Sequence, residues 1–174
     1  MPETWPHEFA RRMSQYTLGR PAGEGQVAAS IKVRVTSGCF HREHSPQAYR
    51  LLDDEVRLWP RNEEQQFDLV EHESGPEILV YVAVATAGIT LAKSVIDLVV
   101  AIVKPRSDGI RKGDKPSDAL EVVVRRSIDE GRVDEEIVIR LGHLDRIDRA
   151  EVQGSILRAL ERLLREKGKH DRTG

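Results

Sequence analysis

Cysteine, net charge and phosphate-binding motifs are all scarce in this sequence of 174 residues. Cys39 is the only cysteine, so no disulfide can form within the chain, which is typical of a protein in a reducing cytoplasm. The formal charge is −2, from 27 basic and 29 acidic residues, and this argues against a general nucleic-acid binder. Neither a G-x-x-x-x-G-K-[ST] nor a G-x-G-x-x-G motif is present. We therefore expect no cofactor and no enzymatic activity.

Signal-peptide character is also missing, because the first residues, MPETWPHEFARRM, contain no apolar core. What the chain does have is one long apolar run, Pro76–Val103. As a single helix its 28 residues would extend roughly 42 Å, more than the ~30 Å of a bilayer's hydrocarbon core. Lys93 and Asp97 interrupt the run, and each would cost about 2.5–3.5 kcal/mol at the centre of a membrane. We expect a buried helix in a soluble, cytoplasmic protein, with a membrane anchor that uses Pro76–Val103 as a single span as the alternative.

The polar residues of this expected helix share one narrow stripe. Lys93 and Asp97 are four residues apart and can therefore pair on one helix face. Because the rest of the helix is apolar, the sequence predicts that this pair is buried and mutually satisfied.

The remaining patterns predict an α+β fold, with a mixed sheet of about four strands packed on the long helix and on an amphipathic C-terminal helix. We expect an N-terminal amphipathic arm and linker over residues 1–26, a single domain over 27–168 and a flexible tail over 169–174. The expected order is α-β-α-β-α-β-β-α. The expected elements are Pro6–Tyr16, Ser30–Val35, a helix that starts at Ser45-Pro46 and ends before Pro60, Gln66–His72, Pro76–Val103, a hairpin of Leu120–Arg126 and Glu135–Leu141, and a helix capped by Asp148 that runs to about Lys167.

A sheet covers only one side of so long a helix, so its other apolar faces need a partner. A second copy of the chain is the simplest cover, since two-fold homodimers are the commonest oligomers. The arm could also dock on the helix, either within its own chain or from a neighbour. The sequence therefore predicts a protein–protein interface at Ala83, Ala87, Gly88, Leu91, Trp5 and Phe9, and a homo-oligomer.

Cys39, His41 and His44 form the densest group of metal-ligand side chains. Zinc binds both residue types, and a loop could fold all three side chains around one ion. A zinc-dependent hydrolase at this loop is therefore a third functional alternative. However, Cys-x-His-x-x-His is not a standard spacing, and His72 or His143 would have to supply a fourth ligand. We therefore expect no metal, with these three residues as weak candidates.

From Gln66 to Lys167 the order of elements resembles the small accessory domains that accompany effectors in bacterial conflict and immunity systems. The shared features are a strand, a Gly-Pro-Glu helix start, a membrane-like helix, a charged loop, a β-hairpin and a C-terminal helix. No invariant motif matches residue by residue, so no functional residues are transferred. The resemblance implies a bacterial, non-catalytic adaptor or anchor that has an effector protein as a partner.

Overall fold

The computed structural model describes residues 5–57, 67–114, 119–129, 132–142 and 147–165. These residues form an α+β fold, which confirms the predicted class. The elements are α1 (Trp5–Gly19), β1 (Gln26–Val35), α2 (Pro46–Arg57), β2 (Phe67–His72), β3 (Gly75–Ala85), β4 (Gly88–Thr90), α3 (Lys93–Arg111), β5 (Leu120–Asp129), β6 (Arg132–Leu141) and α4 (Arg149–Arg165).

The strands form one six-stranded sheet in the order β2-β3-β1-β5-β6, and the short β4 pairs with the end of β3. Every pairing is antiparallel, and Lys32 of β1 lies directly opposite Glu77 of β3. The prediction of a mixed sheet with about four strands is therefore wrong, because it missed β3 and β4 and the pairings that they make.

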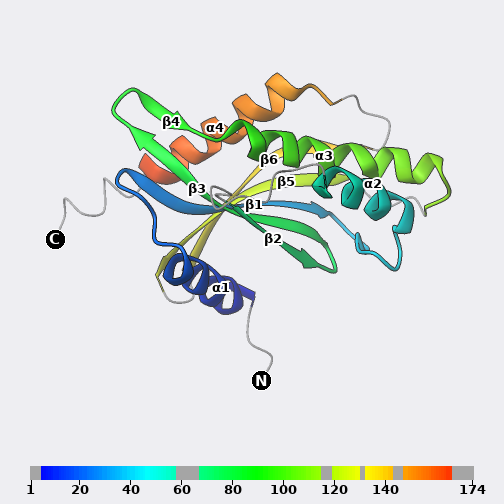
Figure 1. Cartoon of the computed structure of the whole chain (residues 1–174), viewed down its shortest axis with the longest axis horizontal. Coiled ribbons are helices and arrows are strands. Elements are labelled where there is room, and N and C mark those ends of the chain that lie inside the picture. Colours follow the sequence, from blue (N-terminus) through cyan, green and yellow to red (C-terminus); the bar gives the residue numbers. More distant parts are fainter. Residues whose placement is uncertain (1–4, 58–66, 115–118, 130–131, 143–146, 166–174) are drawn as a thin grey trace.

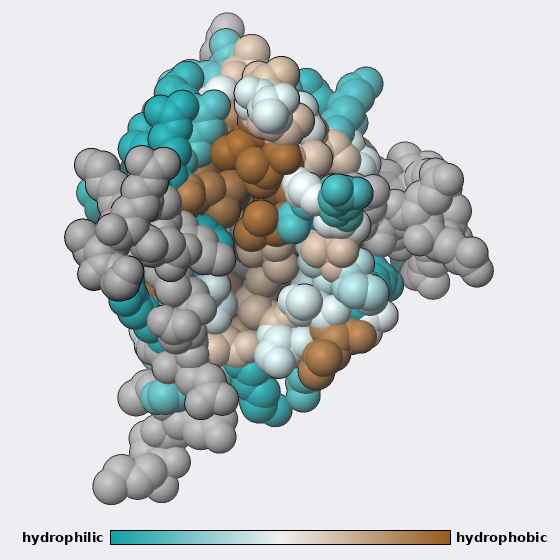
Figure 2. All heavy atoms as spheres, turned by 90° about the vertical axis from the view of Figure 1, so that its left-hand side faces the viewer, coloured by the Kyte–Doolittle hydropathy of each residue, from teal (hydrophilic) through white to brown (hydrophobic). Residues whose placement is uncertain are grey.

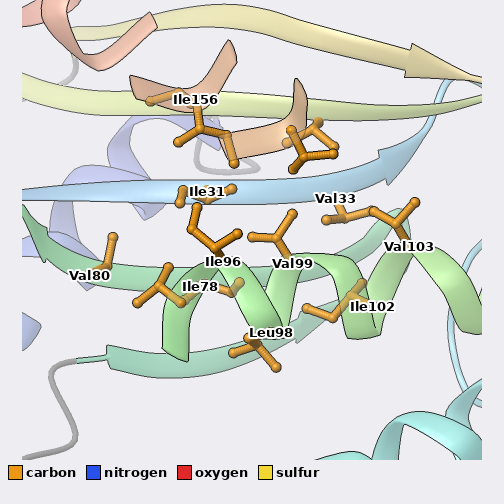
Figure 3. Packing of buried hydrophobic residues seen from close by; sticks show 14 of the residues in the cluster. Ile31, Val33, Ile78, Val80, Ile96, Leu98, Val99, Ile102, Val103 and Ile156 are labelled. Atoms are coloured by element: carbon orange, nitrogen blue, oxygen red, sulfur yellow. The ribbon is translucent and has the colours of Figure 1, made fainter. Parts of the chain in front are cut away.

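Helices cover the two faces of this sheet unequally (Figure 1). Among the described residues, helices α2, α3 and α4 lie on one face, which we call the apolar face, and α1 lies on the other, which we call the charged face. Ile31, Val33, Ile78 and Val80 project from β1 and β3 toward α3 and α4 (Figure 3). They pack there with the helix residues Ile96, Leu98, Val99, Ile102, Val103 and Ile156.

The single long helix predicted over Pro76–Val103 does not exist. Its first part is strand β3, a turn and strand β4, and only its last part belongs to α3. β3 is a central strand that is buried on both faces: Ile78, Val80 and Val82 point into the main core, and Leu79 and Tyr81 pack against α1. Burial on both faces removes the polar alternation that reveals a half-buried strand, and so the run could be mistaken for a buried helix.

Helix α3 also continues past the predicted end at Val103 to Arg111. Its last turns pack closely on the start of α2, and a side chain at Gly109 would overlap Ala48 and Asp114. The Asp114 carboxylate accepts hydrogen bonds from the N–H groups of Gln47 and Ala48, at 3.1 and 3.0 Å, and so satisfies the first turn of α2.

The other predicted elements are confirmed in type within the described residues, although β1, β5 and β6 are longer than predicted. β5 and β6 form the predicted hairpin. The Asp148 carboxylate caps α4, accepting hydrogen bonds from the N–H groups of Ala150 and Glu151 at 2.9 and 3.2 Å. The predicted tail, 169–174, lies outside the described residues. No helix in the described part of the chain is long and apolar enough to cross a membrane.

Candidate functional site

The four predicted interface residues of the apolar run lie at the β3–β4 hairpin rather than along a helix. Ala83 is near the end of β3, Ala87 is in the turn, Gly88 starts β4 and Leu91 follows it. Ala87 is exposed and the other three are partly exposed. The predicted helical interface is therefore wrong in its geometry, although these residues do reach the surface.

The hairpin carries an apolar surface at one end of the molecule. Figure 2 views this end and shows strongly apolar residues gathered in one area of it. Val84 is 39% exposed, a large value for a valine. No ionisable residue occurs between Ala83 and Ala92. We call this the hairpin surface and define it by its solvent-accessible apolar residues Val84, Ala85, Ala87, Ile89 and Leu91.

The arm residues of the predicted interface have different positions. Phe9 is fully buried in its own chain, where it packs with Met13, Tyr16, Leu79 and Tyr81. It is therefore not available to a second molecule, and its prediction as an interface residue is wrong. Trp5 is 48% exposed, and its ring lies 5.1 Å from the Arg125 guanidinium carbon. The arm docks on the sheet of its own chain.

The predicted buried pair of Lys93 and Asp97 is also wrong. Lys93 is exposed at the first residue of α3, and Asp97 pairs instead with Arg149 of α4 at 2.7 Å. Asp97 and Arg149 are 42% and 41% exposed. The expected burial depended on a continuous helix that is apolar on most faces, whereas α3 begins at Lys93 and this side of it faces solvent and α4.

The structure brings the weak metal candidates together. One ligand atom each from Cys39, His41 and His44 lies within 4.8 Å of the other two. The His41 and His44 rings are 4.5 Å apart between centroids. Cys39 and His41 are partly exposed and His44 is exposed, so solvent reaches the group. His72, one of the two fourth ligands considered, is engaged elsewhere with Glu77, and His143 lies outside the described residues.

Residues between and beside these ligands fix the loop to the rest of the fold. Phe40 is 1% exposed and its N–H donates to the Glu73 carbonyl at 2.8 Å. Arg42 forms paired hydrogen bonds to Asp53 on α2 and to Glu71 on β2. The Ser45 N–H donates to the His41 carbonyl at 2.9 Å, at the entry to α2. Three anchored residues therefore alternate with three ligand residues along the loop.

A buried charged cluster beneath α1 was not predicted. Its centre is the Glu77 carboxylate, which is 0% exposed. Ser30 Oγ donates to it at 2.8 Å, Arg12 Nη1 at 3.0 Å, and His72 Nε2 lies at 2.7 Å. Arg125, 3% exposed, has Nη2 3.7 Å from Glu77 and Nε 3.8 Å from Glu135, and neither nitrogen has a hydrogen-bond partner within the described residues.

Burial and neighbouring charges set the protonation of this cluster. Burial opposes the charge of Glu77, but the His72 contact, the Arg125 and Arg12 charges and the Ser30 hydrogen bond together lower its pKa to about 2. Burial, reinforced by the Arg125 charge and only partly opposed by Glu77, lowers the pKa of Lys32 to about 8. A signal was present in the sequence: Lys32, Glu77 and Arg125 are charges that directly adjoin aliphatic residues of strand-like segments.

Comparison of the chain with protein-family models, with curated proteins and with solved structures gave no match. The functional interpretation therefore depends on the geometry of these three places: the hairpin surface, the Cys39 loop and the charged cluster.

Proposed function

We propose that this chain is a non-catalytic accessory domain that acts by protein association, and that its first partner is a second copy of itself. The observation that carries the proposal is the hairpin surface, with Val84 at 39% exposure beside the partly exposed Ile89 and Leu91. Clustered apolar side chains at one end of a molecule are typical of a protein interface.

The hairpin surface suits a contact between identical molecules. A two-fold contact places the same residues opposite one another, so any charge on the surface would face a like charge. The segment from Ala83 to Ala92 contains no ionisable residue, so this repulsion does not arise. Its polar residues, Thr86 and Thr90, are exposed and can form a rim that stays compatible with water.

The accessory role is proposed from the resemblance to the small domains that accompany effectors in bacterial conflict and immunity systems. The elements that still support this resemblance are the strand β2, the β5–β6 hairpin and the C-terminal helix α4. The Gly-Pro-Glu segment begins strand β3 rather than a helix, so the resemblance now depends on fewer shared features. A bacterial effector as a further partner, and the cytoplasm as the compartment, belong to the same proposal.

Light scattering on the full chain at micromolar concentration tests the association. We expect a dimer for the unmodified chain and a monomer for Val84→Glu, because the variant places two like charges at the centre of the contact. Leu18→Glu is the matched control: Leu18 is 81% exposed on α1, which is not part of the hairpin surface, and its substitution should leave the dimer intact. A monomeric unmodified chain, or equal dissociation by both variants, would overturn the proposal.

A further inference from the structure

We propose that Cys39, His41 and His44 bind one divalent transition-metal ion, Zn²⁺ being the ion that their chemistry fits best. The sequence argued against such a site because its spacing is unusual and it lacks a fourth ligand. The structure changes that judgement, because the three ligand atoms already lie within 4.8 Å of one another in the folded chain. The proposal is independent of the proposed association, since it involves a different part of the surface.

The donor set selects the class of metal. One thiolate and two imidazoles are ligands of Zn²⁺ and of chemically similar ions such as Co²⁺, whereas Mg²⁺ and Ca²⁺ prefer oxygen. Three protein ligands leave one position of a tetrahedral site for water. The exposure of His44 and the partial exposure of Cys39 give solvent access to that position.

The loop is held in place before any metal binds. Phe40 is buried against Tyr49, with ring centroids 5.5 Å apart, and the Tyr49 hydroxyl donates to the Phe40 carbonyl at 2.9 Å. Arg42 is fixed by two carboxylates, one on a helix and one on a strand. Because these residues separate the ligands along the chain, the backbone on both sides of His41 is constrained. A ligand set that needs little rearrangement binds its metal with less loss of conformational freedom.

Metal binding requires two local changes. The Glu43 N–H donates to Nδ1 of His41 at 3.2 Å. A metal on Nδ1 would take the same lone pair, and a metal on Nε2 would require a proton on Nδ1, so this hydrogen bond is lost in either case. The Cys39 thiol also releases its proton when it binds as thiolate. The chemistry involves no oxidation: the metal–ligand bonds form, and one proton passes to solvent.

Cobalt titration of the full chain, purified without a histidine tag and after treatment with a chelator, tests the site. We expect one equivalent of Co²⁺ per chain and a thiolate-to-cobalt charge-transfer band, both reversed by Zn²⁺. Cys39→Ser should abolish the band, and His41→Ala and His44→Ala should each weaken binding at least tenfold. His7→Ala is the matched control, because His7 is an exposed histidine on α1 outside the group, and its substitution should change nothing.

The metal-free melting temperatures of all four variants show whether they fold, since the substituted side chains are exposed or partly exposed. Absence of the band from the unmodified chain would overturn the proposal, as would identical binding by Cys39→Ser. Half an equivalent of metal per chain would also overturn it, because it would mean that two chains share the ion. The Val84→Glu variant, which we expect to be monomeric, should bind metal as tightly as the unmodified chain. A result that overturns the proposed dimer is therefore distinguishable from one that overturns the proposed metal site.

Discussion

Glu77 and Ile78 are neighbours in strand β3, and both are fully buried. Their side chains lie on opposite faces of the sheet, one in a charged environment and the other in an apolar core. Ile78 enters the apolar core beneath α3 and α4. Glu77 enters the charged cluster beneath α1, where Ser30, Arg12 and His72 contact its carboxylate. Apolar burial is non-directional and nearly independent of pH. A buried carboxylate is stabilised only while its hydrogen-bond donors and neighbouring positive charges remain in place. One strand therefore presents two interiors that should respond differently to mutation and pH.

The largest effect is expected from Glu77→Gln. This change removes the negative charge and leaves Arg12, Arg125 and Lys32 facing a neutral group. Loss of one partner of a buried ion pair costs about 3–5 kcal/mol of unfolding free energy. Urea denaturation at pH 7 measures the loss. The exposed Glu24 provides a matched control, since Glu24→Gln should change stability by less than about 0.5 kcal/mol. Equal stability of the two variants would mean that Glu77 is not effectively buried.

The same group makes the unmodified chain sensitive to acid. The pKa of Glu77 is about 2 in the folded chain and 4.5 without the fold. The folded state therefore holds fewer protons than the unfolded state across this interval, and stability falls as pH drops from about 4.5 to 2. The shift corresponds to about 3 kcal/mol. Glu77→Gln should lose this part of the acid dependence, and an unchanged pH profile would contradict the assignment.

Lys32 should have an effect of opposite sign. Its pKa is lowered from 10.5 to about 8, so the fold disfavours its charged form. Lys32→Met retains much of the side-chain length without the charge and should stabilise the chain at pH 7 by about 1–3 kcal/mol. The unmodified chain should gain stability from about pH 8 to 10, because the unfolded state holds more protons there. Thermal denaturation at pH 7 and 9.5 tests both points, and a destabilised Lys32→Met would show that the ammonium group is favourably paired.

The sequence allowed prediction of the fold where charged or capping residues mark an element, and failed in the run from Ile78 to Ala92, which contains no charged residue. Helix α2, the β5–β6 hairpin and the Asp148 cap have clear amphipathic or capping patterns, and all three are confirmed. β3 is buried on both sides, so its period of two residues is hidden. Its content of β-branched and aromatic residues, and Gly88 and Thr90 within the run, were the available signs of a strand and a turn.

The candidate sites follow the same division. Cys39, His41 and His44 could be identified from their types and spacing, because a short loop keeps sequence neighbours close in space. The charged cluster could not be assembled, because its members come from α1, β1, β2, β3 and β5. Their proximity depends on strand register, such as the pairing of Lys32 with Glu77, which was unknown while β3 was taken for a helix.

On the apolar side of β3, Ile78→Val should produce a smaller effect that does not depend on pH. It removes one methylene from the core, where Ile78 is 0% exposed, and such changes cost about 0.5–1.5 kcal/mol. The loss should be the same at pH 3 and pH 7, in contrast to Glu77→Gln. Denaturation at both pH values provides the measurement. A loss that differed between them would show that the two interiors are coupled across the strand.

The smallest effect is expected at the Asp97–Arg149 ion pair, on the outer surface of the helices that cover the apolar face. Its atoms are 2.7 Å apart, as close as the contacts of Glu77, but both side chains are about two-fifths exposed, at 42% and 41%. Water already solvates such charges, so an exposed pair contributes only about 0.2–1 kcal/mol. A double-mutant cycle of Asp97→Ala and Arg149→Ala should give a coupling in this range that decreases in ~1 M salt, where screening is strong. A coupling of several kcal/mol that persists in salt would contradict this prediction. It would mean that the exposed pair is as strong as the buried contacts of Glu77, and that burial does not determine the strength of ion pairs in this fold.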